Sequence, residues 1–256
     1  MIAFENIAAR YGQRTVLNGV SAKFRKGAVT GIVGPNGAGK TTLFRVSLGL
    51  LPASAGTVRV MDKPLADWPR DTLARTIAYL PQGSDAHWPL LARRLVSLGR
   101  MPHLTALRPL TLADEAAIND ALARCDALSL ASRRMDELSA GERARVLLAR
   151  ALATNAPVLL ADEPAAHLDP AHQLQLMDLL REEATRGTAV AVTLHDLSLA
   201  ARYCDEIVVL DKGRVAAQGT PDIALSDDTL AKVFGINALR LADRGGRQTL
   251  VGWKQI

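Results

Sequence analysis

The sequence predicts an α/β fold in which a parallel sheet is flanked by helices. One observation is a set of short, wholly apolar runs, each preceded by a stretch with helical spacing: Val158–Ala161, Ala189–Thr193 and Ile207–Leu210. Apolar strands of this kind are typical of a parallel sheet that is covered on both faces. The other is a glycine-rich segment, Gly34–Gly39, between the apolar run Ala28–Val33 and a helical pattern over Leu43–Leu51. Helices and strands therefore alternate along most of the chain.

The first fifth of the chain has a different pattern. Ile2–Ile7 and Val16–Phe24 alternate apolar and polar residues, and Gly12 marks a turn between them. This period of two predicts antiparallel strands. Gly56–Val60 and Ile77–Leu80 indicate further short strands. We expect an N-terminal antiparallel β subdomain.

The middle of the chain is predicted to be helical. Helical spacing covers three segments between Pro89 and Met135: Leu91–Leu98, Leu112–Ala127 and Leu130–Met135. We expect one domain over 1–256, with a helical subdomain inserted at about 89–150. Residues of about 220–256 are predicted to form a short C-terminal extension, in which a hairpin turns around Arg244-Gly245-Gly246.

Composition fits one large globular domain, because 48% of the 256 residues are hydrophobic. The net charge of +5 suggests nucleic acid or an anionic membrane surface as a partner. The positive residues are dispersed, which favours a third interpretation, a solvated basic surface. Cys125 and Cys204 lack metal-ligand spacing and indicate free thiols in a reducing compartment. With no signal peptide and no long apolar run, we expect an intracellular chain that reaches a membrane only through partners.

The glycine-rich segment carries the pattern G-x-x-x-x-G-K-[ST]. Its residues are Gly34, Pro35, Asn36, Gly37, Ala38, Gly39, Lys40 and Thr41, followed by Thr42. Glycines let backbone N–H groups surround phosphate oxygens, and the next helix presents its positive end to them. Lys40 adds a charge at the β- and γ-phosphates, and the Thr41 hydroxyl suits Mg²⁺. A chance glycine-rich turn would lack this strand-to-helix context, so we predict a nucleotide site in a P-loop NTPase core. The loop alone leaves kinases, GTPases and many motor proteins open.

Two carboxylates, Asp162 and Glu163, follow the apolar run that begins at Val158. Ligands of open α/β sheets bind at this end of the strands. Asp162 is suited to hold Mg²⁺, and Glu163 to polarise the attacking water. In isolation the pair would indicate two solvated acids; beside a phosphate loop we assign it to the nucleotide site.

A third segment, Leu138-Ser139-Ala140-Gly141-Glu142, resembles the signature motif of ATP-binding-cassette (ABC) proteins. Gln82, Asp169 and His195 stand in the order that the family has, and the resemblance extends over about residues 2–220. It implies a homodimer in which the signature of one cassette contacts the γ-phosphate held by the other. Ser139 and the Gly141 amide would make those contacts.

The signature departs from the family at Ala140 and Glu142, where Gly and Gln are common. Ser139 and Glu142 also form S-x-x-E before an apolar helix, which is a capping box. The two interpretations coexist, because a capped helix N-terminus also attracts anions. Since a carboxylate near the γ-phosphate would repel it, we expect Glu142 to fold back onto the Ser139 amide.

The resemblance gives roles to four further residues. Tyr11 would stack on adenine, Gln82 would ligate Mg²⁺ and report to the membrane partner, and His195 would contact the γ-phosphate. Asp169 would make a dimer contact and, with Pro170, begin the next helix. The structural alternatives are an ordinary strand-end Tyr, a loop Gln and a structural His. The other histidines are assigned as surface or contact residues: His87, His103, His167 and His172.

A single cassette without a fused membrane segment resembles a bacterial importer subunit. The segment from Val96 to His103, VSLGRMPH, resembles cassettes of iron–siderophore, haem and cobalamin importers; a helix ending at Gly99 before a proline-containing loop is the structural alternative. The resemblance implies permease subunits, a periplasmic substrate-binding protein that acts indirectly, and a position on the cytoplasmic side of the inner membrane. Another transporter type and a nucleic-acid-handling ABC ATPase remain alternatives, although we expect no nucleic-acid partner.

Overall fold

The computed structural model describes residues 1–83, 89–104, 109–242 and 248–255. Its central sheet has six strands in the order β10-β9-β3-β8-β7-β6. They are β3 (Val29–Val33), β6 (Ile77–Leu80), β7 (Val158–Asp162), β8 (Ala189–Thr193), β9 (Glu206–Asp211) and β10 (Arg214–Gly219). Five strands are parallel, and β10 pairs antiparallel with β9 at one edge. The predicted parallel sheet is confirmed, whereas β10 was not predicted.

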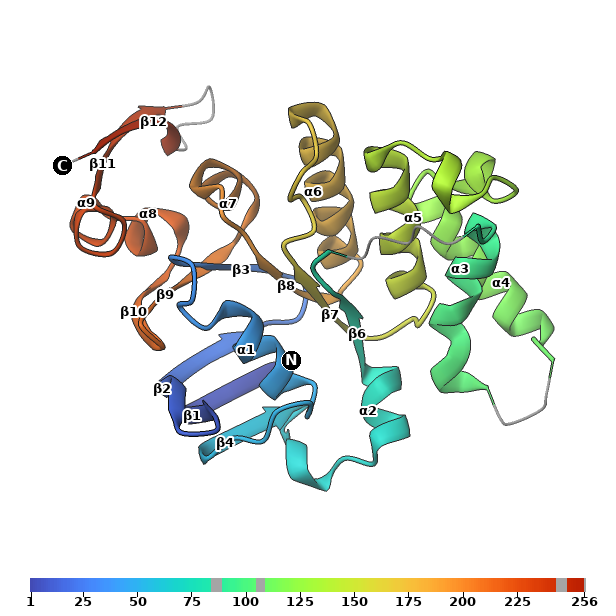
Figure 1. Ribbon diagram of the computed structural model, residues 1–256, viewed down its shortest axis with the longest axis horizontal. Helices are drawn as coiled ribbons and strands as arrows, with labels where there is room; N and C mark the ends of the chain where they lie inside the picture. Colours follow the sequence, from blue (N-terminus) through green and yellow to red (C-terminus); the bar gives the residue numbers. More distant parts are fainter. Residues whose placement is uncertain (84–88, 105–108, 243–247, 256) are drawn as a thin grey trace.

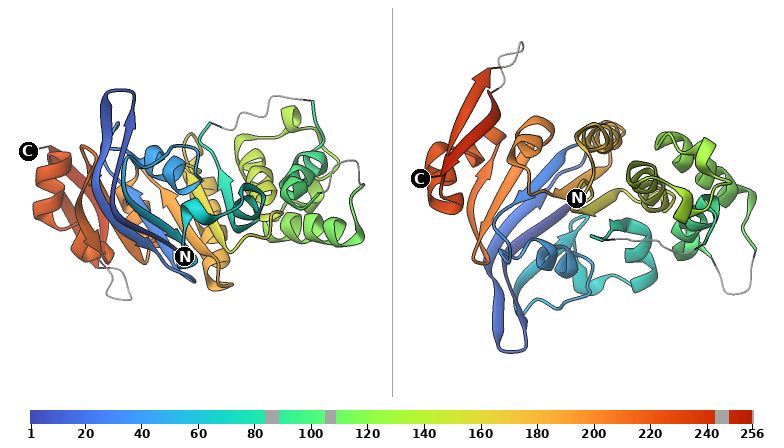
Figure 2. Two further views of the ribbon diagram at one scale, coloured as in Figure 1. Left: turned by 90° about the horizontal axis from the view of Figure 1, so that it is seen from below. Right: turned by 45° about the horizontal axis from the view of Figure 1, so that its top comes forward.

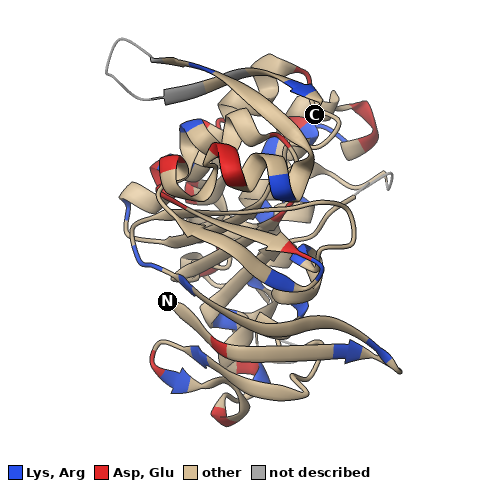
Figure 3. Ribbon diagram, turned by 90° about the vertical axis from the view of Figure 1, so that its left-hand side faces the viewer, with Lys and Arg blue, Asp and Glu red and all other residues tan. Residues whose placement is uncertain are grey.

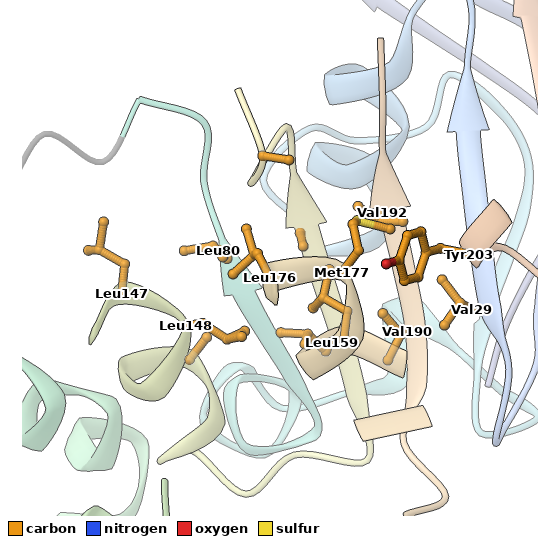
Figure 4. Close-up of a cluster of buried hydrophobic side chains, with 14 of the residues drawn as sticks. Val29, Leu80, Leu147, Leu148, Leu159, Leu176, Met177, Val190, Val192 and Tyr203 are labelled. Atoms are coloured by element: carbon orange, nitrogen blue, oxygen red, sulfur yellow. The ribbon is translucent and has the colours of Figure 1, made fainter. Parts of the chain in front are cut away.

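Alternate residues of the central strands enter two different cores. On one face, Val190, Val192 and Leu159 pack against α6 (Pro170–Thr185) and α7 (Leu197–Tyr203), as Figure 4 shows. On the other, Ala191 and Leu160 pack against α1 (Lys40–Ser47) and the N-terminal strands. The central strands are therefore buried on both faces, which explains why β7 and β8 are apolar except for the polar residue at the end of each. Figure 1 shows α6 and α7 on the face opposite α1.

The N-terminal strands form a second, antiparallel sheet, as predicted, in the order β2-β1-β4-β5. Its strands are β1 (Ile2–Tyr11), β2 (Arg14–Phe24), β4 (Ala55–Val60) and β5 (Lys63–Pro64). Edge-to-face aromatic contacts link this sheet to the central one through Phe24, Phe44 and Tyr79, with ring centroids 6.4 Å apart at each step. These contacts fix α1, which carries Phe44, between the two sheets.

Helix α1 ends earlier than predicted. The expected pattern extended to Leu51, whereas the helix stops at Ser47. Gly49 has φ 66°, in the left-handed region that ends helices at little cost for glycine. Beyond it lie η1 (Leu65–Asp67) and α2 (Arg70–Thr76), which precede β6.

A helical group lies at the end of the molecule opposite the C-terminus (Figure 2). It consists of α3 (Ala92–Ser97), η2 (Leu98–His103), α4 (Leu112–Arg124), η3 (Leu128–Leu130), η4 (Met135–Glu137) and α5 (Ala140–Leu152). The helix predicted over Leu130–Met135 is wrong. Backbone groups there bond instead to the start of α3, with the N–H of Ala92 donating to the Arg133 carbonyl and that of Met135 to Leu90. A local helix cannot form while those groups are used by the neighbouring segment.

The segment VSLGRMPH anchors this helical group. The buried Arg100 donates through Nε to Asp114 Oδ1 at 2.9 Å, and through Nη1 to the Ala153 carbonyl at 2.8 Å. His103 Nε2 lies 2.8 Å from the Thr154 carbonyl, and Thr154 Oγ1 donates to the Gly99 carbonyl at 3.1 Å. These bonds tie η2 to the N-terminus of α4 and to the end of α5. His103 is therefore a contact residue, as expected.

The C-terminal part contains α8 (Pro221–Ala224), α9 (Asp227–Thr229), the π-helical turn η5 (Leu230–Phe234), β11 (Ile236–Ala242) and β12 (Gln248–Gln255). Strands β11 and β12 pair as the predicted hairpin; the predicted turn at Arg244-Gly245-Gly246 lies outside the described residues. Basic and acidic residues are interspersed over this side of the molecule (Figure 3). Within the described ranges, no helix is long and apolar enough to cross a membrane.

Candidate functional site

The glycine-rich loop joins β3 to α1 at the edge of the sheet where the parallel strands end. Gly34 has φ 153°, and a Cβ there would lie 2.1 Å from the Leu210 carbonyl oxygen. Gly39, the N-cap of α1, has φ 109°, and a Cβ would meet the Leu17 side chain at 2.6 Å. Both positions therefore require glycine for conformation and for space. The loop shape predicted from the motif is present.

Lys40, the first residue of α1, is 6% exposed. Its Nζ donates to the carbonyls of Gly34 at 2.8 Å and of Pro35 at 3.4 Å. Burial lowers its pKa, while the nearby Glu163 and Asp162 carboxylates act in the opposite direction. The ammonium group thus lies inside the loop, close to the two acids at the end of β7.

Asp162 is 1% exposed at the end of β7. Thr193 Oγ1 donates to its Oδ1 at 2.7 Å, and Tyr79 Oη donates to its Oδ2 at 3.3 Å. Burial, together with the Asp162 carboxylate, raises the pKa of Tyr79 to about 12. The carboxylate is therefore oriented by residues from both neighbouring strands, β8 and β6.

Glu163 follows in the left-handed region, with φ 49°. This conformation is uncommon for a residue other than glycine and clusters at functional sites. The Glu163 N–H donates to Thr193 Oγ1 at 2.7 Å, which fixes the turn. Its carboxylate accepts a hydrogen bond from Gln82 Nε2 and lies 2.5 Å from His195 Nε2. The structure thus brings together three residues that the sequence places 81 and 32 positions apart.

A pocket of about 560 Å³ unites most of the predicted ATP-binding residues. It is lined by Tyr11, Asn36, Gly37, Ala38, Gly39, Lys40, Thr41, Thr42, Gln82, Glu163 and His195, and also by Arg14 and Val16. Tyr11 is 41% exposed at its rim, and its hydroxyl accepts a hydrogen bond from Arg45 Nη1 at 3.1 Å. An exposed aromatic ring beside a phosphate loop can stack on a nucleobase.

The signature segment lies elsewhere. Among the described residues that line this pocket, Ser139, Gly141 and Asp169 are absent. Ser139 caps α5, and Asp169 caps α6 by accepting the His172 N–H at 3.0 Å, with Pro170 in the first turn. Both predicted caps are confirmed. One chain therefore presents two separate groups of candidate residues.

The sequence did not indicate several residues of these two groups. Thr193 holds Asp162 and Glu163 together, and Tyr79 supports Asp162. Arg133 Nη1 donates to Glu142 Oε1 at 3.0 Å beside the signature. A polar residue at the end of an apolar strand was an available signal for Thr193. The contacts of Tyr79 and Arg133 depend on tertiary structure. His87, which was assigned as a surface or contact residue, lies outside the described residues.

A larger cleft, of about 1090 Å³, lies between the sheets and the helical group. Its lining is mostly apolar and includes Leu51, Trp68, Leu73 and Tyr79, together with Pro102 and Thr154 from the helical side. Pro102 belongs to VSLGRMPH, so the bonds that anchor this segment also shape one wall of the cleft.

Comparison with known proteins gives one consistent result. The family model described as ABC transporter matches residues 17–166. The chain is 45% identical over 231 residues to the hemin import ATP-binding protein HmuV of Rhodococcus jostii, covering 90% of this chain and 78% of that protein. It is 44% identical over 220 residues to the cobalamin import ATP-binding protein BtuD of Halobacterium salinarum, covering 86% of this chain and 55% of that protein.

Among solved structures, the dimeric bacterial ABC transporter cassette MJ0796 is similar, with a TM-score of 0.72 and 28% identity. The match covers 86% of this chain and 99% of that chain. Sequence and structure comparisons therefore agree on the family.

Proposed function

This chain belongs to the ABC transporter family, and we propose that it is the ATP-hydrolysing subunit of an importer of haem, iron–siderophore or cobalamin-type substrates. The assignment of ATP hydrolysis rests on one observation. Glu163 is held between Gln82 and His195 at the wall of the pocket formed by the phosphate loop. A general base for hydrolysis needs this combination of fixed orientation and proximity to a phosphate site.

Each residue then has a defined task. Tyr11 stacks on adenine, and the N–H groups from Asn36 to Thr42 surround the phosphates. Lys40 leaves its two carbonyl partners to contact the phosphate oxygens and offsets the charge that develops there. Glu163 accepts a proton from the attacking water, and His195 contacts the γ-phosphate.

Three residues fit Mg²⁺. The Thr41 hydroxyl, the Gln82 side-chain carbonyl and the Asp162 carboxylate are hard oxygen donors, which this ion prefers. Each oxygen of Asp162 accepts one hydrogen bond, and a carboxylate has about four lone-pair sites, so acceptor capacity remains. When bound, the ion would neutralise charge on the phosphate oxygens.

The second group of residues supports a homodimer. Ser139, Gly141 and Asp169 lie outside the pocket of their own chain. We propose that they complete the pocket of the partner subunit, with Ser139 and the Gly141 amide at the γ-phosphate and Asp169 at the contact between subunits. ATP would then close the dimer, and hydrolysis would reopen it.

We assign the larger cleft to a permease element. Its apolar lining and its position between the sheets and the helical group suit an amphipathic helix. The protein would then sit peripherally on the cytoplasmic side of the inner membrane, and a periplasmic binding protein would act indirectly through the permease. We retain the proposed division into one domain, 1–256, with a helical insertion at about 89–150 and an extension at about 220–256; the grouping of α3–α5 at one end supports it.

The substrate class rests on the names of two relatives, a hemin and a cobalamin import protein, and on the segment VSLGRMPH. The test is to tag the chain, express it in its native host, and identify what co-purifies from detergent-solubilised membranes. A polytopic permease is expected, whose reconstitution with this chain should give ATP-dependent uptake of haem, ferric siderophore or cobalamin. Recovery of nucleic-acid factors instead would contradict the importer while leaving the ATPase assignment intact.

A further inference from the structure

His172 occupies a specific place in the first turn of α6. Its backbone N–H donates to Asp169 Oδ1 at 3.0 Å, and its Nδ1 lies 2.7 Å from Asp169 Oδ2. These two contacts hold the pKa of Asp169 below its ordinary value, the backbone bond contributing most. The Asp169 side chain, although 60% exposed, is thus fixed by one neighbouring residue.

The same imidazole ring covers Gly141 in the signature. A Cβ on Gly141 would lie 2.0 Å from His172 Cδ2 and 2.5 Å from its Nε2. No side chain larger than hydrogen fits while the ring is there, so His172 gives Gly141 its steric requirement. Gly141 itself is buried in the first turn of α5.

The two contacts join different parts of the molecule. Gly141 lies in the first turn of α5, in the helical group, whereas Asp169 precedes α6, which packs on the central sheet (Figure 1). Both residues lie in the group that the proposed function assigns to the partner subunit, Gly141 at its γ-phosphate and Asp169 at the contact between subunits. His172 is the side chain that touches both.

We propose that His172 is a positioning residue that locks the signature and Asp169 of one subunit into a single surface, which engages the nucleotide of the other. The inference rests on the proposed function, because it requires the signature to act across a dimer. A movement of α5 relative to α6 would separate Gly141 from the ring. The signature and Asp169 would then bind the other subunit independently of each other.

Three substitutions separate the two contacts. His172→Asn keeps a nitrogen close to the position of Nδ1 and leaves the Gly141 surface uncovered. His172→Phe keeps the bulk over Gly141 and loses the bond to Asp169. His172→Ala loses both contacts of the ring, to Asp169 Oδ2 and to Gly141, and keeps only the backbone N–H bond to Asp169 Oδ1. His103→Asn serves as a matched control in the isolated protein, because His103 is bonded to the Thr154 carbonyl beyond the C-terminal end of α5, whereas the signature lies at the start of that helix.

The measurements are kcat, the Hill coefficient for ATP, binding of a fluorescent ATP analogue to the monomer, and ATP-dependent dimerisation in a Glu163→Gln background. We expect His172→Ala to weaken dimerisation and lower kcat by about ten-fold or more, a typical coupling between two sites. The Hill coefficient should approach one, while monomer binding stays unchanged. His172→Asn and His172→Phe should each recover part of the loss, and His103→Asn should change thermal stability only.

Two results would overturn the inference. One is dimerisation and cooperativity of His172→Ala equal to the parent; the other is a loss that merely follows thermal stability across all four variants. If His172→Ala does not fold, the Asn and Phe variants decide in the same way. A failure of the proposed function is distinguishable, because Glu163→Gln alone would then not dimerise with ATP.

Discussion

Glu142 and Ser139 cap each other at the start of α5. The Ser139 N–H donates to Glu142 Oε2 at 2.8 Å, and the Glu142 N–H donates to Ser139 Oγ at 3.2 Å. The expected fold-back of Glu142 is therefore confirmed. The Ser139 N–H and, to a smaller extent, Arg133 lower the pKa of Glu142, so it is a carboxylate whose charge is compensated within its own chain.

We predict that Glu142→Gln changes ATPase activity only modestly. Glutamine makes the same capping box, and the charge that it removes is already bonded to the Ser139 N–H and to Arg133. Steady-state ATP hydrolysis with matched protein concentrations checks this. A loss on the order of several hundred-fold would show that the carboxylate itself takes part in the reaction.

We expect Arg133 to affect kcat only while the residue at position 142 is acidic. Arg133→Gln leaves Glu142 without its cation, and we expect a reduction in kcat of about two- to five-fold, because Arg133 is 43% exposed and such pairs are worth less than about 1 kcal/mol. The double substitution Arg133→Gln/Glu142→Gln should restore the rate. A double-mutant cycle with no coupling would assign Arg133 to its bond with the Glu137 carbonyl instead.

Glu163→Gln should bind ATP, lose turnover and form an ATP-dependent dimer of about twice the monomer mass. The amide keeps the size of the side chain but cannot accept the proton. Size-exclusion chromatography with light scattering, with and without ATP, measures the dimer. Hydrolysis near the parent rate would remove Glu163 from its role.

Asp114→Asn should destabilise the fold and flatten its dependence on acid pH. Hydrogen bonds from Thr111 and Arg100 lower the pKa of Asp114 to about 2, below the ordinary value of about 3.9. A depressed pKa stabilises the fold above about pH 4, and this contribution is lost as the pH falls towards 2. Removing the charge also leaves the buried Arg100 guanidinium without a counter-charge. This costs about 3 kcal/mol in the free energy of unfolding.

Urea denaturation at several pH values checks this prediction. Asp120→Asn is the matched control, because Asp120 lies on the same helix and its side chain is 62% exposed. Its loss should cost less than about 1 kcal/mol. Equal effects of the two substitutions would contradict the importance of the buried pair.

Local patterns were sufficient to predict the phosphate loop and most of the strands, although not β10. Strands such as β6 and β8 have the predicted bounds, because apolar runs between turn residues leave few alternatives. The helix predicted over Leu130–Met135 fails because its backbone groups bond to the start of α3. Spacing within a segment carries no information about a distant partner.

The same reason explains the residues that were missed at the site. Thr193 reaches Asp162 because β7 and β8 pair in a register that places them side by side. His172 reaches Gly141 because α5 and α6 begin at neighbouring points of the fold. Motif residues can be identified from their spacing in the sequence. The residues that hold them in place can be identified only once strand register and helix packing are known.

A side chain of β6 links the large cleft to the acids of the ATP site. Tyr79 lines the cleft, and its hydroxyl is bonded to Asp162; three residues later in the chain, Gln82 is bonded to Glu163. A molecule seated in the cleft would touch a residue that is one hydrogen bond from the buried acid of the ATP site. A displacement of Tyr79 at the cleft would therefore reach Asp162 through one hydrogen bond, and the same stretch of chain continues from β6 to Gln82 and its contact with Glu163.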